Sequence, residues 1–147
     1  MNLPTALLLV AAIFGDGPAE ISFMENVVSI ESSFGRTSKN AFRITREAFT
    51  EVTTKDTPKF NRDLQRVYKA TGVNIKKTTL KEVKRNILLN TIVARLYLRT
   101  VPTPIPSSVA DQAEYWLKYY NRGGVYQTLS SKEDVLNIFI THARHLR

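Results

Sequence analysis

The chain has no cysteine and little histidine, and these absences exclude several kinds of site. Without cysteine it cannot form a disulfide bond, a thiolate zinc site or a cysteine nucleophile. His142 and His145 are the only histidines among 147 residues. A histidine-rich metal site is therefore not expected, and a Ser-His-Asp triad would have to use one of these two side chains. No metal ion or organic cofactor is implied by the remaining residues.

Long apolar segments are also scarce. The nearly apolar segment from Leu3 to Phe14 is too short to cross a bilayer comfortably, and Asp16-Gly17-Pro18 ends it. It lacks the positively charged start and the small-residue cleavage site of a secretory signal. We expect residues 1–17 to form a buried first helix or an apolar N-terminal extension, without a transmembrane span. A weak export or membrane-contact segment is the alternative.

Acidic residues are outnumbered, 13 against 21 Lys and Arg, which gives a net charge of +8. Residues 55–99 hold twelve basic and three acidic side chains, a local net charge of +9. Such a segment attracts polyanions, and DNA, acidic lipid headgroups and peptidoglycan are all candidates. The alternative is a solvated helical face that only keeps the protein soluble.

The periodicity of apolar residues predicts a mainly α fold in a single domain spanning residues 1–147. Residues with the capping or first-turn character of a helix start recur along the chain: Pro18, Thr45, Thr57-Pro58, Thr79, Ser108 and Ser131. The capping box formed by Thr79 and Glu82 is expected to open one long helix with a single apolar face. Its inward side chains would be Val83, Ile87, Thr91, Ala94 and Leu98.

Three further features complete the predicted layout. The helix that begins at Thr57 should turn Phe60, Leu64, Val67 and Tyr68 inward. The helix that begins at Ser108 should end at Gly123-Gly124. Residues 32–45 follow no helical pattern, so they are expected to form a loop or a small hairpin.

Glu31 is the strongest candidate for a catalytic residue. It follows the apolar stretch Val27-Val28-Ser29-Ile30, where a buried helix gives way to a turn that contains Gly35. Desolvation at such a place disfavours the charged carboxylate, so the group can hold a proton near neutral pH and transfer it to a leaving oxygen. That is the task of the general acid in glycoside cleavage. The plain alternative is an exposed glutamate at a helix end.

Four segments, in order, carry a family resemblance over roughly residues 20 to 125: Glu31-Ser32-Ser33-Phe34-Gly35, Phe42-Arg43-Ile44-Thr45 with Phe49, Asn86-Ile87 with Tyr97-Leu98-Arg99, and Tyr119-Tyr120-Asn121-Arg122-Gly123. The first segment resembles the catalytic-glutamate motif of the soluble lytic transglycosylase and goose-type lysozyme superfamily. The second resembles that superfamily's Met-Gln-Ile-Thr…Phe segment. The third resembles its long Asn-Ile…Tyr-Leu helix, and the fourth its Ala-Tyr-Asn-Ala-Gly segment. The stretch Tyr115-Trp116-Leu117-Lys118-Tyr119-Tyr120-Asn121 is similar to the form found in bacteriophage members. The chain departs from the family at Arg43, which stands where a sugar-contacting glutamine is usual.

The resemblance implies a lysozyme-like helical domain that cleaves peptidoglycan, with Glu31 as general acid. In a lytic transglycosylase the same carboxylate then acts as base on the muramic 6-hydroxyl, whereas an inverting lysozyme needs a second carboxylate ~6.5–9.5 Å away. Candidates for that second group are Glu47, Glu51, Asp56 and Asp63.

The resemblance also assigns substrate contacts. Ser32 and Thr45 would hydrogen-bond near the acid or the N-acetyl group, although Thr45 is also a natural helix cap. Tyr119, Tyr120 and Asn121 would line the cleft, with Tyr120 against the glutamate, although this aromatic stretch also suits a core. Arg43 would bind the lactyl or peptide carboxylate of the glycan.

Three functions follow from these features. The first is a peptidoglycan-cleaving glycosidase of a bacteriophage, acting on a glycan strand from the virion or in the host periplasm or cell wall, without a clear cleavable signal peptide. The second is a non-catalytic structural component of a virion, tail or secretion machine built on the same scaffold, with other virion proteins as partners. The third is a basic helical DNA-binding protein. Nucleic acid is the least expected partner, since no helix-turn-helix has convincing spacing.

Overall fold

The computed structural model describes residues 1–121 and 131–146, and all regular elements within them are helical. In chain order they are α1 (Leu3–Phe14), α2 (Pro18–Ser32), α3 (Arg46–Thr54), α4 (Pro58–Thr71), the 3₁₀ turn η1 (Ile75–Lys77), α5 (Leu80–Arg85), α6 (Ile87–Arg99), α7 (Val109–Tyr115), the π-helical turn η2 (Trp116–Tyr120) and α9 (Lys132–His145). The predicted mainly α domain is confirmed. Residues 33–45 form a loop and not a hairpin. The helix end predicted at Gly123-Gly124 lies outside the described residues.

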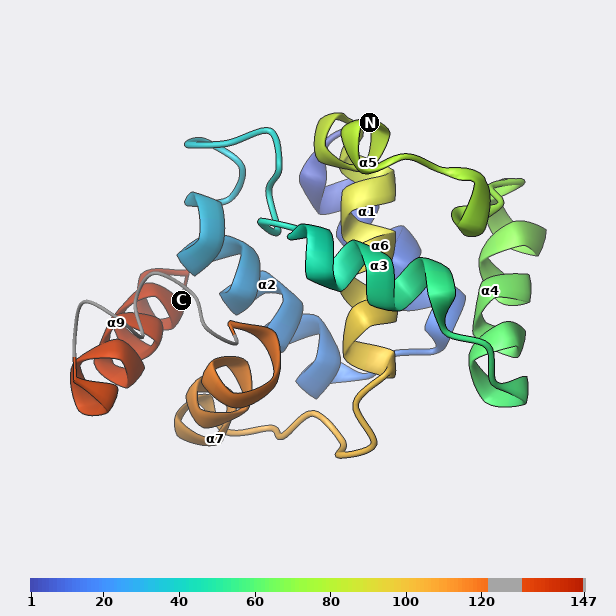
Figure 1. Cartoon of the computed structure of the whole chain (residues 1–147). Helices are drawn as coiled ribbons and strands as arrows, with labels where there is room; N and C mark the ends of the chain where they lie inside the picture. The colour runs from blue at the N-terminus through green and yellow to red at the C-terminus, as the bar shows by residue number, and fades with distance from the viewer. Residues whose placement is uncertain (122–130, 147) are drawn as a thin grey trace.

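Helix α6 is the centre of the fold. Every residue from Leu89 to Leu98 is buried, because α1, α3, α4 and α5 all pack against this helix. Figure 1 shows α6 running through the middle of the molecule with α3 in front of it and α1 behind. The prediction of a single apolar face was therefore too narrow, since a helix enclosed on all sides has no solvent face to keep polar.

Side-chain caps fix the helix starts that the sequence predicts. Thr45, Thr57, Thr79, Ser108 and Ser131 each accept a hydrogen bond from a backbone N–H in the following turn. The first N–H groups of a helix have no partner inside the helix, so each cap satisfies a group that would otherwise need water.

The long helix predicted after Thr79 is in fact two helices. The capping box of Thr79 and Glu82 is present, but α5 ends at Arg85. Asn86 leaves the helical conformation, with φ −109° and ψ 117°, and its side chain accepts the N–H of Leu89 to cap α6. The break follows from this local bond, since asparagine competes with the helix for backbone partners.

A second layer joins α2 to α7, η2 and α9 through aromatic side chains. The rings of Phe23 and Tyr115 lie 5.3 Å apart in an edge-to-face arrangement, and those of Trp116 and Phe139 are also 5.3 Å apart. Both Phe23 and Trp116 are fully buried. Because Tyr115 packs on Phe23 of α2 and is followed directly by Trp116, this packing brings the Tyr-Trp segment beside the helix that carries Glu31.

Two arginines of the basic segment are used inside the protein. Arg95 forms a two-point ion pair with Asp16 at 2.8 and 2.9 Å, and Arg99 pairs with Asp63 at 2.7 and 3.0 Å. Arg95, Asp16 and Asp63 are all buried, so neither arginine is free to attract a partner.

The place of Asp63 also explains why the predicted orientation of Tyr68 is wrong. The inner face of α4 runs through Phe60, Asp63 and Val67, and Tyr68 lies outside it with 57% of its surface exposed. A buried aspartate held in an ion pair carries no apolar signal in the sequence.

We predict that Asp16→Asn lowers the free energy of unfolding by about 3 kcal/mol, because the Arg95 guanidinium stays buried without a counter-charge. Urea denaturation near pH 7 measures the change. Glu114→Gln is the matched control, since it removes an exposed pair with Lys132 and should cost less than about 1 kcal/mol. Equal costs for the two variants would show that the buried pair contributes no more than a surface one.

Candidate active site

Glu31 lies one residue before the end of α2, and only 4% of its surface is exposed. The helix ends in a tight left-handed turn at Ser33 and Phe34, with φ of 50° and 63°. Ser32 holds that turn, because its hydroxyl donates to the carbonyl of Val28 and accepts the N–H of Gly35. The Glu31 side chain is thus fixed at a helix end that faces the interior and not bulk water.

Arg43 holds the same helix end from the following loop. Its Nε and Nη2 donate to the main-chain carbonyl of Glu31 at 3.2 and 2.8 Å. The distance from Nε to the carboxylate Oε2 is 4.0 Å, so the charges are near but do not form a close ion pair. Arg43 adopts a left-handed backbone conformation, φ 52°, and its side chain is 55% exposed. The guanidinium therefore fixes the helix end while part of it remains open to solvent.

Two aromatic side chains of η2 complete the surroundings of Glu31. The indole N–H of Trp116 interacts with the Glu31 carboxylate and favours its charged form. The hydroxyl of Tyr120 donates to the carbonyl of Phe42, the residue before Arg43. Burial, and then the charge of Glu31, raise the pKa of Tyr120 well above 10, so this phenol stays protonated at neutral pH.

These surroundings change the acidity of Glu31. Burial raises the pKa of Glu31 from 4.5 to about 7, against the smaller opposing effects of the Arg43 charge and the Trp116 indole. A carboxyl group with this pKa is partly protonated at neutral pH and can both give and take a proton there. The arrangement is therefore suited to general acid–base chemistry.

The position of the Arg43 loop depends on two asparagines. Asn90 of α6 accepts the N–H of Phe42 at 2.8 Å and donates to the side chain of Asn40 at 2.7 Å. Asn40 in turn bonds both the N–H and the carbonyl of Ile44. Because Asn90 is fully buried on the central helix, it anchors the loop that presents Arg43 and the Phe42 carbonyl.

The structure brings some of the predicted site residues together and leaves others apart. Tyr120 and Arg43 lie at Glu31, as described above. Tyr119 instead lies against Thr103, with 3.3 Å between their hydroxyl oxygens, and against the ring of Tyr115. Thr45 is exposed and caps α3 by accepting the N–H of Ala48. Roles of Ser32, Thr45, Tyr119 and Asn121 in ligand binding remain predictions.

Sequence reasoning missed Trp116 and Asn90 as parts of this site. The sequence names Trp116 only within the stretch that is similar to bacteriophage members of the family, and the π-helical turn that brings it to Glu31 leaves no mark in the apolar pattern. Asn90 gives a weak signal, a side chain with an amide inside the apolar run Ile87 to Val93. A buried amide needs partners, so such a position indicates a long-range contact without naming it.

Of the four proposed second carboxylates, three are engaged elsewhere. Asp63 pairs with Arg99, Asp56 accepts from Asn61 at 2.8 Å, and Glu51 lies 3.9 Å from Lys55. Glu47, exposed in the first turn of α3, is the remaining candidate. Within residues 1–121 and 131–146, no three His, Asp or Glu side chains are grouped as metal ligands.

Comparisons with protein-family models, with curated proteins and with solved structures return no match to this chain.

We predict that Glu31→Gln stabilises the protein at high pH. Because the folded state holds the Glu31 proton up to a pKa of about 7 and the unfolded chain releases it near 4.5, the wild-type free energy of unfolding falls as pH rises through this window. The loss approaches about 3 kcal/mol above pH 7. Gln cannot ionise, so the variant should exceed the wild type by about 1–3 kcal/mol more at pH 8 than at pH 4.5 in urea denaturation. The exposed Glu114→Gln serves as control, and a pH-independent difference for Glu31→Gln would contradict the raised pKa.

We predict that Arg43→Gln raises the pKa of Glu31 above 7, because the nearby positive charge is lost while burial is kept. Carbon-13 NMR of the glutamate carboxyl groups measures the titration directly, without a substrate. Arg43→Lys should stay nearer the wild-type value, and Arg36→Gln, an exposed loop arginine, should leave it unchanged. A Glu31 pKa unaffected by Arg43→Gln would show that the guanidinium acts only on the backbone carbonyl.

Proposed function

We propose that this chain is a peptidoglycan-cleaving glycosidase of the lytic transglycosylase or muramidase type, with Glu31 as its general acid and base. The observation that carries the proposal is the buried carboxyl group with a pKa of about 7 at the end of α2. A carboxylic acid that is protonated near neutral pH is what cleavage of a glycosidic bond requires. The family resemblance of the four sequence segments supports the same chemistry.

In the proposed reaction, Glu31 donates its proton to the oxygen that bridges N-acetylmuramic acid and N-acetylglucosamine. The bond from the muramic anomeric carbon to that oxygen breaks, and positive charge develops on the sugar ring. The Glu31 carboxylate then takes the proton of the muramic 6-hydroxyl, whose oxygen closes the ring onto the anomeric carbon. One carboxylate suffices for this sequence, in agreement with the engagement of Asp63, Asp56 and Glu51 elsewhere.

The neighbours of Glu31 have distinct parts in the proposal. Tyr120 keeps its hydroxyl on the Phe42 carbonyl and acts as a positioning residue. Arg43 is more than half exposed, so it can bind a lactyl or peptide carboxylate of the glycan without leaving the Glu31 carbonyl. We place the enzyme with a bacteriophage, in the virion or at the host cell wall, on the resemblance alone.

A non-catalytic structural component of a virion is the second candidate. The observation that favours it is the two-point bond from Arg43 to the Glu31 carbonyl, because a glutamine in that place would leave more room for a sugar. In this case the buried carboxyl group would be only a part of the core.

We predict that the wild-type protein clears a suspension of purified sacculi and that Glu31→Gln lowers the rate at least about a hundredfold, since the amide keeps the shape but transfers no proton. The rate of the wild type should fall as pH rises through about 7, because the acid must start protonated. Arg36→Gln serves as the control with an unchanged rate.

Mass spectrometry of the products distinguishes the two enzyme classes. Anhydromuramic ends indicate a transglycosylase, and reducing ends indicate a lysozyme for which Glu47→Gln becomes the next variant. Sacculi left intact by both wild type and Glu31→Gln would favour the structural component, and equal clearing by both would remove Glu31 from the mechanism.

A further inference from the structure

Helix α1 presents apolar side chains on its outer as well as its inner face. Leu3, Ala6, Val10 and Phe14 are buried against the rest of the protein. On the opposite side Leu8 is 67% exposed, and no charged side chain occurs before Asp16. A surface helix normally turns charged and polar residues outward, so an apolar outer face indicates an interaction site for a membrane or a protein partner.

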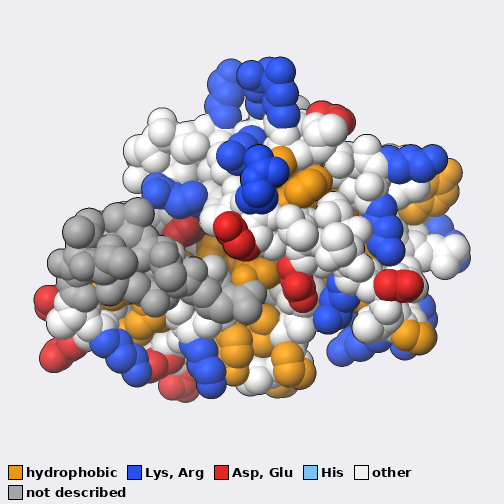
Figure 2. All heavy atoms as spheres, viewed as in Figure 1, with side chains coloured by type: hydrophobic (Ala, Val, Ile, Leu, Met, Phe, Trp, Pro, Cys, Tyr) orange, Lys and Arg blue, Asp and Glu red, His pale blue; other side chains and the backbone are white. Residues whose placement is uncertain are grey.

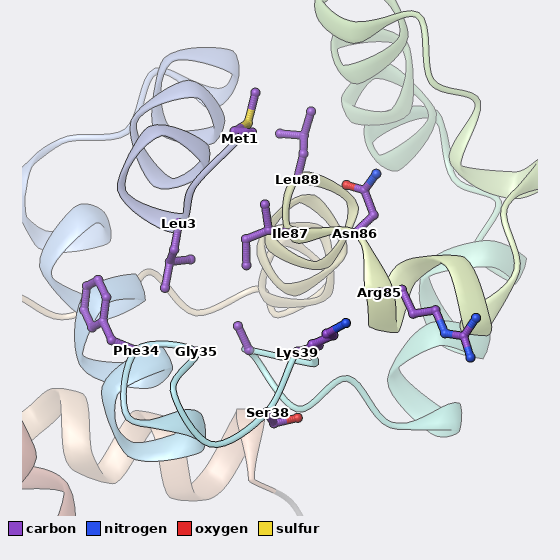
Figure 3. Close-up of a pocket in the computed structure, with 11 residues that line it drawn as sticks. Met1, Leu3, Phe34, Gly35, Ser38, Lys39, Arg85, Asn86, Ile87 and Leu88 are labelled. Carbon is purple, nitrogen blue, oxygen red and sulfur yellow. The ribbon is translucent and has the colours of Figure 1, made fainter.

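A cavity of about 630 Å³ opens at the N-terminal end of this helix. Its wall is formed by the start of α1, the end of α5, the start of α6 and the loop after α2. It mixes polar side chains with the apolar ones of Met1, Leu3, Phe34, Ile87 and Leu88. Figure 3 shows Met1 and Leu3 on one side, Ile87 and Leu88 from α6 beside them, and Lys39 across from them on the loop. Arg85 lies to one side, and no acidic residue lines the cavity. The cavity therefore combines apolar side chains with the cations Lys39 and Arg85.

The cations around this cavity are free to meet a partner. Lys39, Lys81, Lys84 and Arg85 are all exposed, and none forms an ion pair within the described part of the chain. The one acid among them, Glu82, is held in the capping box with Thr79. Figure 2 shows Lys and Arg side chains gathered at the top of the molecule, where Figure 1 places α5 and the N-terminus.

We propose that the outer face of α1, together with this cavity, is a docking surface for an anionic phospholipid bilayer, with a headgroup phosphate bound between Lys39 and Arg85. An apolar helix face inserts at the level of the lipid headgroups, and adjacent cations are attracted to the negative surface of the leaflet. The cations at the cavity match that charge, and the apolar side chains match the acyl and glycerol region beneath it. None of the helices in residues 1–121 and 131–146 is long and apolar enough to span a bilayer. In the proposed contact, α1 lies along the membrane surface.

The lipid surface explains both features better than a nucleic acid does. Phosphate groups of DNA would bind the cations of α5, but they would not cover the exposed Leu8 or the apolar side chains of the cavity. The basic face of α4, with Arg62, Arg66 and Lys69, carries comparable charge but does not line the cavity. That face offers a control of matched charge.

Flotation with phospholipid vesicles tests the proposal. The wild type should float with mixed phosphatidylcholine–phosphatidylglycerol vesicles and not with phosphatidylcholine alone. Leu8→Asp, at an exposed position, should weaken binding at least about tenfold. The pair Lys39→Glu with Arg85→Glu at the cavity should do the same, and so should the pair Lys81→Glu with Lys84→Glu on α5. The matched pair Arg62→Glu with Arg66→Glu on α4 should retain binding. Thermal melting confirms that each variant is folded.

A further variant reports vesicle binding by a change in fluorescence. Leu8→Trp should show blue-shifted tryptophan emission with the mixed vesicles only, since the indole enters the headgroup region. If Leu8→Asp binds the vesicles as strongly as the wild type does, the proposal is overturned. The same holds if the α4 and α5 pairs of substitutions weaken vesicle binding equally.

Two other outcomes would replace the lipid with a different occupant. A dimer in size-exclusion chromatography that Leu8→Asp abolishes would make a second copy the occupant of the face. Binding of duplex DNA that depends on Lys81 and Lys84, with no vesicle binding, would make nucleic acid the partner. The vesicle assay contains no glycan, so its failure leaves the glycosidase proposal untouched.

Discussion

The hydrogen bonds of Asn90 are the constraint on which the site depends. One buried amide on the central helix α6 holds the main chain of Phe42 and the side chain of Asn40. Through these two residues, Asn90 fixes the loop that contains Arg43. Arg43 donates from this loop to the carbonyl of Glu31, and the Tyr120 hydroxyl donates to the loop at the carbonyl of Phe42. Each of these groups is polar and lies at or near the interior, so an error of a few tenths of an ångström in the loop would leave several donors and acceptors without partners. The loop is thus held by side-chain hydrogen bonds, although it contains no regular structure.

Burial raises the pKa of Glu31, and the neighbouring Arg43 and Trp116 side chains limit this rise. A fully unassisted carboxyl group in an apolar interior would hold its proton well above neutral pH and would be a poor acid. The Arg43 charge and the Trp116 indole both favour the carboxylate, which keeps the pKa near 7. The distance of 4.0 Å from guanidinium to carboxylate is part of this balance, because a close ion pair would leave no proton to transfer at neutral pH.

Local chemistry was predictable from the sequence, and long-range geometry was not. The threonine and serine caps, the N-terminal helix and the burial of Glu31 at the end of α2 all follow from residues within a few positions of one another. The break at Asn86 was missed, because a single asparagine inside an apolar pattern does not reveal that its side chain will cap a new helix. Trp116 and Asn90 were missed as site residues, since their roles depend on partners more than forty positions away. The basic segment was overestimated, because the internal partners of Arg95 and Arg99 lie 79 and 36 positions away in the sequence.

The π-helical turn makes the length of the segment between Trp116 and Tyr120 a fixed quantity. Its hydrogen bond from the N–H of Asn121 to the carbonyl of Trp116 encloses one residue more than an α-helical turn does. Removing a single residue there would replace the wide turn by an ordinary α-helical one and bring Tyr120 one position closer to Trp116 along the chain. The spacing between the indole and the phenol would then no longer be the one that serves both the carboxyl group and the loop. The length of this segment is therefore constrained as well as its side chains.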